Sequence, residues 1–229
     1  MKMTTGRLIA AGGGSGDDER PLLEQLHDWI GTNARVLYWP MAQPNEGRRH
    51  EQCLAWLTEV LRPMGITSIS MWSDFAGRSP EQIPEHDAVF IGGGCTYLLL
   101  HELKESGFDR ALIEYYRNGG IIYGGSAGAI VLGSDIKPCA HIDRNFCGLQ
   151  DTAALNLMSG LAVARHYRNE HADILRQCSG ELQTSILALS ERTGVTVERG
   201  AMRITGHEPA MLLTENFITE LPAGNLVGV

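Results

Sequence analysis

Gly120-Ile121-Ile122-Tyr123-Gly124-Gly125-Ser126-Ala127-Gly128 is the stretch that decides the fold. Gly120 to Tyr123 is predicted to be a buried strand, and a helix is predicted to begin at Ala127, with only a tight turn between them. Gly124 to Gly128 matches the pattern G-x-S-x-G, which places a serine on a sharp turn from strand to helix. The flanking glycines remove Cβ atoms that would clash in such a turn. We therefore predict that Ser126 is a nucleophile, displayed at the start of the helix.

The rest of the chain repeats this alternation of short apolar runs with longer segments of helical period, which is typical of parallel strands joined by crossover helices. The sequence therefore predicts an α/β fold with a mostly parallel sheet flanked by helices. The predicted strands are Arg7 to Ala11, Ala34 to Trp39, Ile66 to Trp72, Ala88 to Ile91, Gly120 to Tyr123, Leu161 to Arg165, Ser185 to Leu189 and Val195 to Glu198. The predicted helices are Pro21 to Ile30, Arg49 to Leu61, Thr96 to Glu105, Phe108 to Arg117, one from Ala127, and Ala172 to Cys178. The stretch from Ser134 to Gly160 is expected to be rich in loops.

The composition is that of an ordinary globular protein. Of the 229 residues, 43% are hydrophobic and 20% are charged, which excludes a disordered chain, a collagen and a coiled coil. We expect a single α/β domain over residues 1–229, because no linker, repeat or low-complexity tract divides the chain. The 27 acidic residues outnumber the 19 basic ones, so the net charge is −8. Such a charge suits a phosphate backbone poorly, and nucleic acid is not an expected partner.

The sequence also predicts where the protein resides. No apolar stretch approaches the ~20 residues of a spanning helix, and Met1 to Ala11 has the pattern of neither a signal peptide nor a membrane anchor. The five cysteines, which are Cys53, Cys95, Cys139, Cys147 and Cys178, are odd in number and dispersed. We therefore expect a cytoplasmic protein with reduced thiols and no membrane partner.

A nucleophilic serine on such a turn needs backbone N–H groups that stabilise an oxyanion. The N–H of Ala127, directly after Ser126, is placed to be one donor. Gly92-Gly93-Gly94 follows a strand that is expected to lie beside that of Ser126, and its glycines would let the backbone approach a substrate closely. A plain turn, or a loop that holds an anion at the start of the next helix, is the alternative interpretation.

The serine also needs a base, and the chain has eight histidines. Ligands of open α/β sheets gather at the carboxyl ends of strands, so the useful histidine should directly follow a strand. His166 does so, after Leu161 to Arg165. The remaining histidines are weaker candidates: His27, His50 and His101 fall within predicted helices and His86 in a turn, whereas His141, His171 and His207 stay open as alternatives.

The base must be oriented by a carboxylate, which fixes its tautomer. Glu191 comes just after the predicted strand from Ser185 to Leu189, and Asp143 and Asp173 are its competitors. Four strand ends would thus bring a glycine loop, a serine, a histidine and a glutamate to one edge of the sheet. The chain order of serine, histidine and acid differs from that of the α/β-hydrolases, which disfavours that fold.

Four segments carry a resemblance to a known family. They are Ile91-Gly92-Gly93-Gly94-Cys95-Thr96, Gly125-Ser126-Ala127-Gly128-Ala129, Ala164-Arg165-His166-Tyr167 and Leu187-Ala188-Leu189-Ser190-Glu191-Arg192-Thr193. Together they resemble the peptidase E family, which contains aspartyl dipeptidase and cyanophycinase. The resemblance implies a class I glutamine amidotransferase-like fold with flavodoxin-like three-layer architecture and a catalytic triad of Ser126, His166 and Glu191. It also implies an oxyanion hole made by the N–H groups of Gly94 and Ala127.

The function implied by this resemblance is that of a serine hydrolase of the dipeptidase type. Its substrate would be a small peptide with an N-terminal aspartyl-type residue, cleaved through an acyl-enzyme by a monomer or homodimer. Hydrolysis of β-aspartyl-arginine bonds, as in cyanophycinase, is the alternative. The family carries an arginine after the histidine that is thought to hold the acidic side chain. Arg168 is the stand-in for it here, and Arg165 also flanks His166, so both are candidate substrate-binding residues.

Cys95 marks a departure from the family, whose glycine loop commonly reads Gly-Gly-Gly-Asn-Thr. This chain has a cysteine in the Asn place. A non-catalytic or redox-sensing protein that uses the Cys95 thiol is therefore a second hypothesis.

No cofactor and no metal are expected. Gly12-Gly13-Gly14-Ser15-Gly16 follows the first strand, but it lacks the spacing of a dinucleotide motif, and Asp17 and Asp18 would repel a phosphate. A structural turn beside the active edge is the better interpretation. The dense cluster of potential metal ligands comprises Cys139, His141, Asp143 and Cys147, and its spacing matches no structural zinc pattern.

Overall fold

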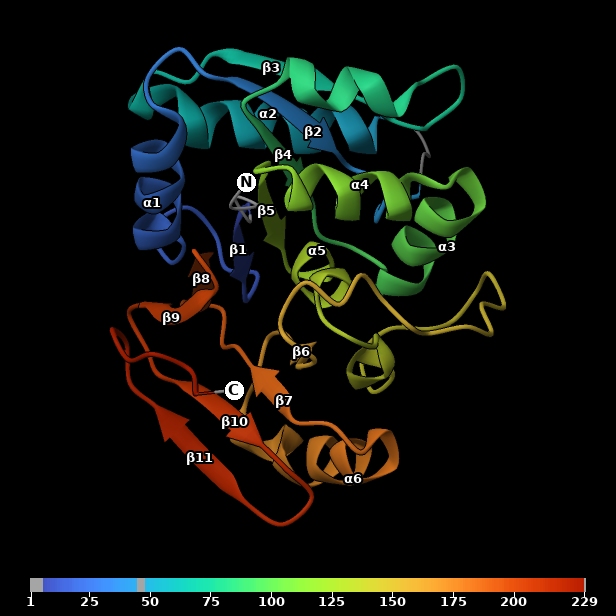
Figure 1. The fold of residues 1–229 in the computed structure, drawn as a ribbon, viewed down its shortest axis with the longest axis vertical. Coiled ribbons are helices and arrows are strands. Elements are labelled where there is room, and N and C mark those ends of the chain that lie inside the picture. The colour runs from blue at the N-terminus through green and yellow to red at the C-terminus, as the bar shows by residue number, and fades with distance from the viewer. Residues whose placement is uncertain (1–5, 45–47, 229) are drawn as a thin grey trace.

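The computed structural model of this protein describes residues 6–44 and 48–228. The expectation that the N-terminus carries no signal or anchor falls partly on residues 1–5, which lie outside the described residues. A seven-stranded sheet occupies the middle of the molecule (Figure 1). Its strand order is β3 (Ser68–Met71), β2 (Arg35–Trp39), β4 (Ala88–Ile91), β5 (Ile121–Gly125), β1 (Arg7–Ala11), β8 (Thr193–Glu198) and β9 (Ala201–Gly206). Neighbours from β3 to β1 are parallel, whereas β8 is antiparallel to both β1 and β9.

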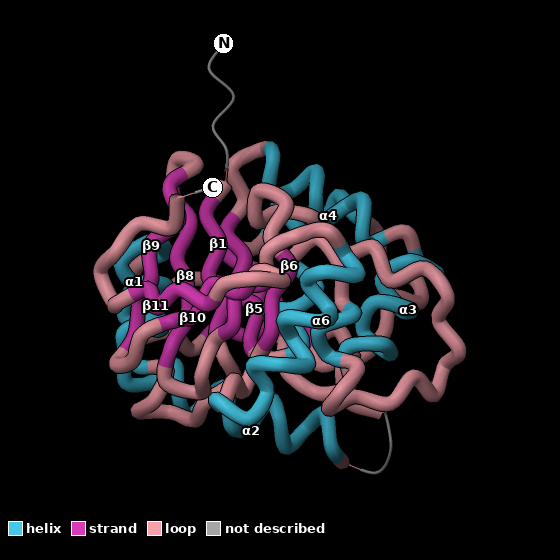
Figure 2. The backbone as a smooth tube through the Cα atoms, turned by 90° about the horizontal axis from the view of Figure 1, so that it is seen from below, coloured by secondary structure: helices cyan, strands magenta, loops and turns pink. Residues whose placement is uncertain are grey.

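Helices cover both faces of this central sheet. One face carries α1 (Arg20–Ile30) and α2 (Arg49–Leu61), and the other carries α3 (Thr96–Ser106), α4 (Phe108–Arg117) and α5 (Ala127–Leu132). Side chains alternate between the faces, as β2 shows: Val36 and Tyr38 are buried with α1 and α2, whereas Leu37 and Trp39 are buried with the helices of the opposite face. Figure 2 shows α2 and α4 on opposite sides of the strands. This layered arrangement confirms the predicted fold class.

Short 3₁₀ helices complete the connections. They are η1 (Arg62–Met64), η2 (Pro80–Glu85), η3 (Lys137–Cys139) and η4 (Asn169–His171). The stretch from 134 to 160 holds η3 and is otherwise irregular, as expected from the sequence.

A second, smaller sheet lies below the central one in Figure 1, with the strand order β11 (Ile218–Leu221), β10 (Ala210–Leu213), β7 (Ile186–Ala188) and β6 (Ala162–Ala164). Between β6 and β7 the chain forms α6 (Ala172–Leu182), which buries Leu175 against this sheet. The prediction that one sheet delivers all the functional residues is therefore wrong for His166 and Glu191, which follow β6 and β7. The reason is that β8 pairs with the free edge of β1, so β6 and β7 pair with each other and β7 with β10.

No strand is predicted beyond Glu198, yet β9, β10 and β11 come after it. A signal for β9 was present. Arg199 and Gly200 both adopt positive φ, at 52° and 79°, which makes the tight turn of a hairpin. After this turn Met202 and Ile204 are buried between exposed neighbours, in the alternation of a half-buried strand.

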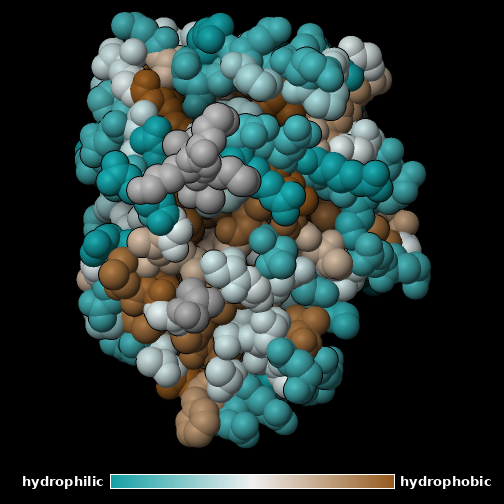
Figure 3. Space-filling model, viewed as in Figure 1, coloured by the Kyte–Doolittle hydropathy of each residue, from teal (hydrophilic) through white to brown (hydrophobic). Residues whose placement is uncertain are grey.

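One hydrophobic core joins the two sheets. Leu8 and Val195 of the central sheet belong to the same buried cluster as Val163, Leu187 and Ala210 of the second sheet. On the face drawn in Figure 3, a group of hydrophobic residues also shows at the surface in the lower left. None of the helices in the described ranges combines the length and the hydrophobicity that crossing a bilayer requires.

Candidate active site

Ser126 lies between β5 and α5 in a strained backbone conformation, with φ 55° and ψ −110°. Its N–H donates to the carbonyl oxygen of Ala11 at 3.0 Å, which fixes the turn against the end of β1. A Cβ atom at Gly128 would lie 2.5 Å from the carbonyl oxygen of Ile91. Only glycine therefore lets α5 start this close to β4. The predicted strand, turn and helix are present, and the serine hydroxyl faces the carboxyl edge of the central sheet.

A histidine and a carboxylate stand in line with this hydroxyl. His166 follows β6, adopts a φ of 49° and donates its N–H to the carbonyl oxygen of Gly12 at 3.2 Å. Its Nε2 lies 3.3 Å from Oγ of Ser126, and its Nδ1 lies 3.0 Å from Oε1 of Glu191. The structure thus brings together the three residues that the sequence analysis selected, from β5 and from the ends of β6 and β7.

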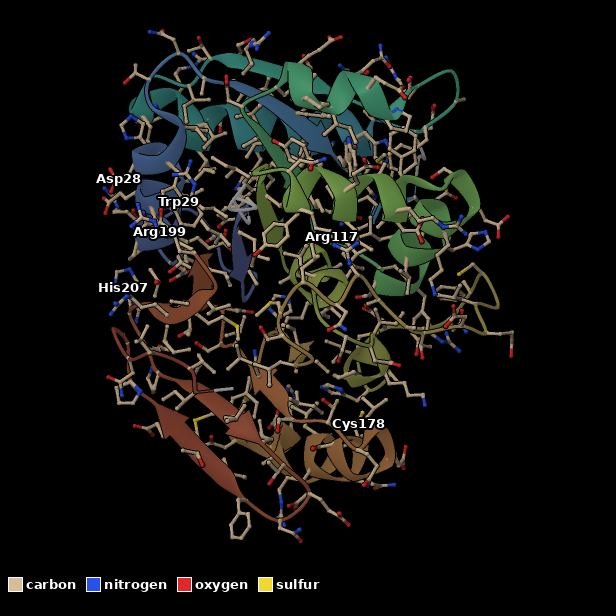
Figure 4. All side chains as sticks on the ribbon, viewed as in Figure 1. Asp28, Trp29, Arg117, Cys178, Arg199 and His207 are labelled. Atoms are coloured by element: carbon tan, nitrogen blue, oxygen red, sulfur yellow. The ribbon has the colours of Figure 1, made fainter. Side chains whose placement is uncertain are left out.

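The competing histidines and carboxylates have other surroundings in the described part of the chain. Asp143 forms an ion pair with an arginine, and Asp173 lies exposed on α6. The rings of His141 and His171 contact each other, with 4.8 Å between their centroids. His207 lies beside α1 (Figure 4), with Nε2 3.1 Å from a backbone carbonyl oxygen.

The surroundings of His166 keep its imidazole neutral. Burial lowers its pKa below the ordinary value, and the positive charge of Arg165 lowers it further. The negative charge and hydrogen bond of Glu191 act in the opposite direction. The net shift is downward, so near pH 7 the ring is uncharged and can accept a proton from the serine hydroxyl.

The glycine loop after β4 presents backbone N–H groups next to the serine. In the described chain neither Gly93 nor Gly94 donates its N–H to a protein acceptor, and Gly94 adopts a φ of 146°. The peptide between these two glycines is held by Gln43, whose Nε2 donates to the carbonyl oxygen of Gly93 at 3.0 Å. Ala127 begins α5, so its N–H has no acceptor within the helix. Sequence reasoning missed Gln43, because nothing in its local pattern distinguishes it from any loop glutamine.

A cavity of about 610 Å³ opens beside Ser126, a volume that suits a small ligand. Its near wall consists of glycines from the loops after β1, β4 and β5, together with Ser126 and His166. The side chains of Tyr38, Phe90, Cys53 and Trp56 line it on the apolar side. Its polar lining comes from Glu19, Gln43, Arg49, Gln52 and Arg165. The cavity therefore combines aromatic walls with a few charged and amide groups around Ser126.

Comparison with known proteins identifies the family. The model of peptidase family S51 matches residues 8–205, which includes all three residues in line. The chain belongs to peptidase family S51. Uncharacterized peptidase Lin0382 of Listeria innocua serovar 6a is 28% identical over 172 residues, 72% of this chain and 75% of that protein. Uncharacterized peptidase Lmo0363 of Listeria monocytogenes serovar 1/2a is 27% identical over 106 residues, 45% of this chain, and the match spans 51% of that protein.

Two crystal structures share the fold of this S51 family member. One, described as a candidate peptidase E protein from Listeria monocytogenes EGD-e, has a TM-score of 0.71 at 20% identity, covering 89% of this chain and 100% of that one. The other is a peptidase from an acI-B1 Actinobacterium, with a TM-score of 0.74 at 18% identity, covering 99% and 98%. The S51 family model and the peptidase relatives, together with this shared fold, confirm the predicted resemblance to the peptidase E family.

The two arginines that flank His166 differ in their positions. Arg165 is 9% exposed and lines the cavity, but its Nη2 is 2.8 Å from Oδ1 of Asp143 and 3.2 Å from the carbonyl oxygen of Gly94. Its charge is thus matched by an internal carboxylate. Arg168 is exposed and does not line the cavity in the described structure. The geometry therefore gives no support to Arg168 as a residue that contacts a substrate near Ser126.

A third arginine, which the sequence analysis overlooked, lines the cavity of this S51 protein. Arg49 lies in the first turn of α2, and its Nη1 is 3.2 Å from Oε1 of Gln43. Among the described residues it forms no ion pair with a carboxylate. The sequence showed only that Arg49 stands on the polar side of a helix, which is where most arginines stand.

The other candidate groups of the sequence lie outside the triad. Cys95 has its Sγ 3.5 Å from the carbonyl oxygen of Arg144 and does not line the cavity in the described chain. Burial raises the pKa of the Cys139 thiol to about 12. Cys178 lies on α6 (Figure 4). The described residues contain no group of three or more His, Cys, Asp or Glu side chains arranged to hold a metal ion.

Proposed function

We propose that this S51 family member is a serine peptidase that hydrolyses small peptides through Ser126, His166 and Glu191. The observation that carries the proposal is the continuous line from the Ser126 hydroxyl through both ring nitrogens of His166 to the Glu191 carboxylate, with separations of 3.3 and 3.0 Å. Nucleophile, base and orienting carboxylate are related in this way in serine hydrolases on several unrelated folds. Membership of a peptidase family supports the same reaction class.

In this mechanism Oγ of Ser126 attacks the carbonyl carbon of the scissile bond while Nε2 of His166 takes its proton. The carbonyl oxygen becomes an oxyanion that accepts hydrogen bonds from the N–H groups of Gly94 and Ala127. His166 then gives the proton to the leaving amine, and the C–N bond breaks to leave an ester on the serine. Water attacks the carbonyl carbon of this ester while His166 accepts a proton from the water. His166 then returns the proton to Oγ of Ser126, the ester C–O bond breaks, and the carboxylic acid product leaves. Glu191 stabilises the imidazolium in both halves of the reaction.

The proposed substrate is a dipeptide or other small peptide with an N-terminal aspartyl-type residue. A carboxylate on the substrate needs a local cation, because the net charge of −8 gives no long-range attraction for an anion. Arg49 is the best candidate, since it lines the cavity without a carboxylate partner among the described residues. Arg165 also lines the cavity, but its ion pair with Asp143 leaves it less free to bind a second carboxylate.

Two alternatives have weaker support. Hydrolysis of β-aspartyl-arginine bonds would use the same triad, and the aromatic side chains of Tyr38 and Trp56 in the cavity could stack on a guanidinium. A redox sensor that uses Cys95 is less favoured, because this thiol faces a backbone carbonyl rather than the cavity.

The test is a panel of Asp-X, isoAsp-X and β-Asp-Arg peptides with the purified protein, together with a serine-directed phosphonate. We expect hydrolysis of at least one class and covalent labelling of Ser126, both abolished in Ser126→Ala. Hydrolysis that persists undiminished in Ser126→Ala would exclude the proposed nucleophile. Selective alkylation of Cys95 without labelling of Ser126 would favour the redox sensor.

The role of Arg49 is tested by Arg49→Met, which should raise KM for acidic substrates about 10- to 100-fold, the worth of one charge-assisted hydrogen bond. Arg168→Met is the matched comparison and should leave KM unchanged. The reverse result would restore Arg168 as the residue that binds the substrate.

A further inference from the structure

Glu19 is a buried carboxyl group that the proposed mechanism does not use. It is the residue before α1, it is 3% exposed, and it lines the cavity beside Ser126. Its Oε2 accepts a hydrogen bond from the hydroxyl of Tyr123 at 2.7 Å. Acidic side chains are almost never this buried without a specific reason, because removing a carboxylate from water is costly. The partners of Glu19 indicate what that reason is.

On one side Glu19 contacts the strand that carries the nucleophile. Tyr123 lies on β5, three residues before Ser126, and it is completely buried. Its ring stacks on that of Phe90 from β4, with 4.3 Å between centroids and 11° between planes. The Tyr123 side chain is therefore held in one position, and its hydrogen bond fixes the position of the Glu19 carboxyl group relative to β5.

On the other side Glu19 faces the glycine loop after β1. Gly13 and Gly14 line the same cavity as Glu19, and their backbone N–H groups favour its ionised form, which lowers the pKa of Glu19 against the effect of burial. A Cβ atom at Gly13 would lie 2.8 Å from Cβ of Ser126 and 2.7 Å from Cε1 of His166, so the loop backbone fits tightly between the two. A Cβ atom at Gly14 would lie 2.2 Å from the carbonyl oxygen of Glu191. The same glycine loop thus packs closely against Ser126, His166 and Glu191.

We propose that Glu19 is a positioning residue for the triad: its carboxylate joins Tyr123 to the glycine loop of Gly13 and Gly14, and the loop in turn holds His166 against Ser126. This inference rests on the proposed serine peptidase. Gly12 supports it from the same loop, since its carbonyl oxygen accepts the N–H of His166 at 3.2 Å. Glu19 acts through this backbone and not on the substrate, so its loss should lower kcat more than it raises KM.

The ionised form of Glu19 is the form that suits this task, because a carboxylate can accept from the hydroxyl and the loop together. A protonated carboxyl must use one oxygen to donate, and it loses part of that capacity. Burial raises the pKa of Glu19 to about 7, the nearby charge of Asp18 adds to the rise, and Tyr123, Gly13 and Gly14 oppose it. Asp18 is itself paired with Arg192 at 3.2 Å.

The direction in which the rate changes with pH follows from these pKa shifts. As the pH falls through about 7, Glu19 takes up a proton, and the loop is held less firmly. His166, whose pKa is lowered, takes up its proton at a lower pH, and the base is then lost. His166 and Arg165 also line the cavity that Glu19 lines, and their charges belong to the same titration. Two ionisations therefore shape the acid side of the rate profile. Protonation of Glu19 should lower kcat/KM about 10- to 100-fold, to a residual level. Protonation of His166 at lower pH then removes the remaining activity, with a limiting slope of about one in log(kcat/KM).

The first experiment compares the wild type with Glu19→Gln, which keeps the size of the side chain and removes its charge. At pH 8 we expect kcat to fall about 10- to 100-fold, the cost of a small displacement of catalytic groups, with KM changed much less. On the acid side the first, partial loss of activity, which the wild type should show as the pH falls through about 7, should be absent from the profile, because only His166 still titrates. A general loss of stability would lower the rate without removing one ionisation from the profile.

The second experiment uses Tyr123→Phe, which keeps Glu19 and removes one donor to it. Without that hydrogen bond the pKa of Glu19 should rise, so the upper ionisation in the rate profile should move to higher pH. Tyr116→Phe is the matched control. Tyr116 is also buried, but it lies at the opposite end of the sheet, where its carbonyl accepts the N–H of Gly6. Its profile should equal that of the wild type.

Two results would overturn the inference. One is a Glu19→Gln protein with wild-type kcat and the same two-step acid profile as the wild type, and the other is a Tyr123→Phe profile that does not move. If Glu19→Gln does not fold, as judged by circular dichroism, Tyr123→Phe decides alone. A wild type that neither cleaves the peptide panel nor reacts with the phosphonate at Ser126 would overturn the proposed function, whereas an active wild type with unaltered variants would overturn only the role of Glu19.

Discussion

Nη2 of Arg165 lies 2.8 Å from Oδ1 of Asp143, and the two side chains are only 10% and 9% exposed. The other oxygen of Asp143 accepts from both the N–H and the hydroxyl of Thr96, at 2.9 and 2.6 Å. Arg165 directly precedes His166, and Thr96 begins α3 just after the glycine loop of β4. This pair therefore connects His166, which is the proposed base, with the loop proposed to stabilise the oxyanion and with the irregular stretch from 134 to 160.

Arg165→Met should reduce the free energy of unfolding by about 3–5 kcal/mol, because it leaves the Asp143 carboxylate buried without its cation. Urea denaturation followed by circular dichroism measures the change. As a control, Arg48→Met removes the exposed pair with Glu51 and should cost less than about 1 kcal/mol. Equal, small losses in both variants would show that the Arg165 pair contributes nothing special to stability.

Gln43→Ala should lower kcat about tenfold and leave KM nearly unchanged, because it frees the peptide that carries the Gly94 N–H. The expected loss is smaller than the 10²–10³ in kcat, roughly, that removal of an oxyanion donor costs, because the Gly94 N–H itself remains. Steady-state kinetics on the best peptide of the panel provide the measurement. Gln150→Ala removes a similar bond, from an exposed side-chain amide to the carbonyl oxygen of Gly148 at 2.9 Å, and should not change kcat. If KM rises and kcat stays constant, the main role of Gln43 is on the substrate side, by direct contact or through Arg49, whose Nη1 donates to its Oε1 at 3.2 Å.

Glu191→Gln should reduce kcat by at least about 10²-fold, because an amide no longer selects the tautomer of His166 or stabilises the imidazolium. Glu191 is 52% exposed at its side chain, so solvent shares part of its role and the loss should be smaller than for a buried acid. The control is Glu170→Gln, which alters a carboxylate that also lies beside a histidine, His171, at 3.7 Å, and is 70% exposed at its side chain. A Glu191→Gln protein with wild-type activity would exclude Glu191 from the triad.

The pH dependence of phosphonate labelling should report His166 directly when it is measured in Glu19→Gln, where the buried glutamate no longer titrates. Labelling requires the neutral imidazole, so its rate should fall as the pH drops through the pKa of His166. Because burial and Arg165 lower this pKa, the midpoint should lie below the ordinary value of 6.5. A midpoint above 6.5 would mean that Glu191 outweighs both effects.

Gly13→Ala should abolish labelling and hydrolysis, because Gly13 adopts a φ of 99° and a methyl group there would lie 2.7 Å from the His166 ring. Gly16→Ala is the control in the same loop. Gly16 also adopts a positive φ, 24°, so both variants strain the backbone, but a Cβ at Gly16 has no atom within 4 Å in the described structure. Its activity should stay within about threefold of the wild type, as expected for a change that moves no neighbour. Full activity of Gly13→Ala would show that the loop can withdraw from the triad.

Local sequence was sufficient for the fold class and for the strained turn that displays Ser126. The alternation of apolar runs and helical segments identified the five parallel strands, because each strand and its crossover helix are contiguous in the chain. The turn at Ser126 was equally predictable, since the glycines that permit it lie within two residues of the serine. His166 and Glu191 were selected by their positions after short strands, and the structure brings both to Ser126.

Only the tertiary structure decided which sheet delivers the base and which charges face the cavity. The pairing of β8 with β1 is a long-range contact, and it assigns β6 and β7 to a second sheet, a result that no local pattern contains. The partners of Arg165 and Glu19 lie 22 and 104 residues away in the chain. Whether a charged side chain binds substrate, pairs internally or supports a loop depends on contacts between residues that are far apart in the chain. Sequence patterns therefore indicated Arg165 as a candidate but could not assign its role, and they did not indicate Glu19 as a candidate at all.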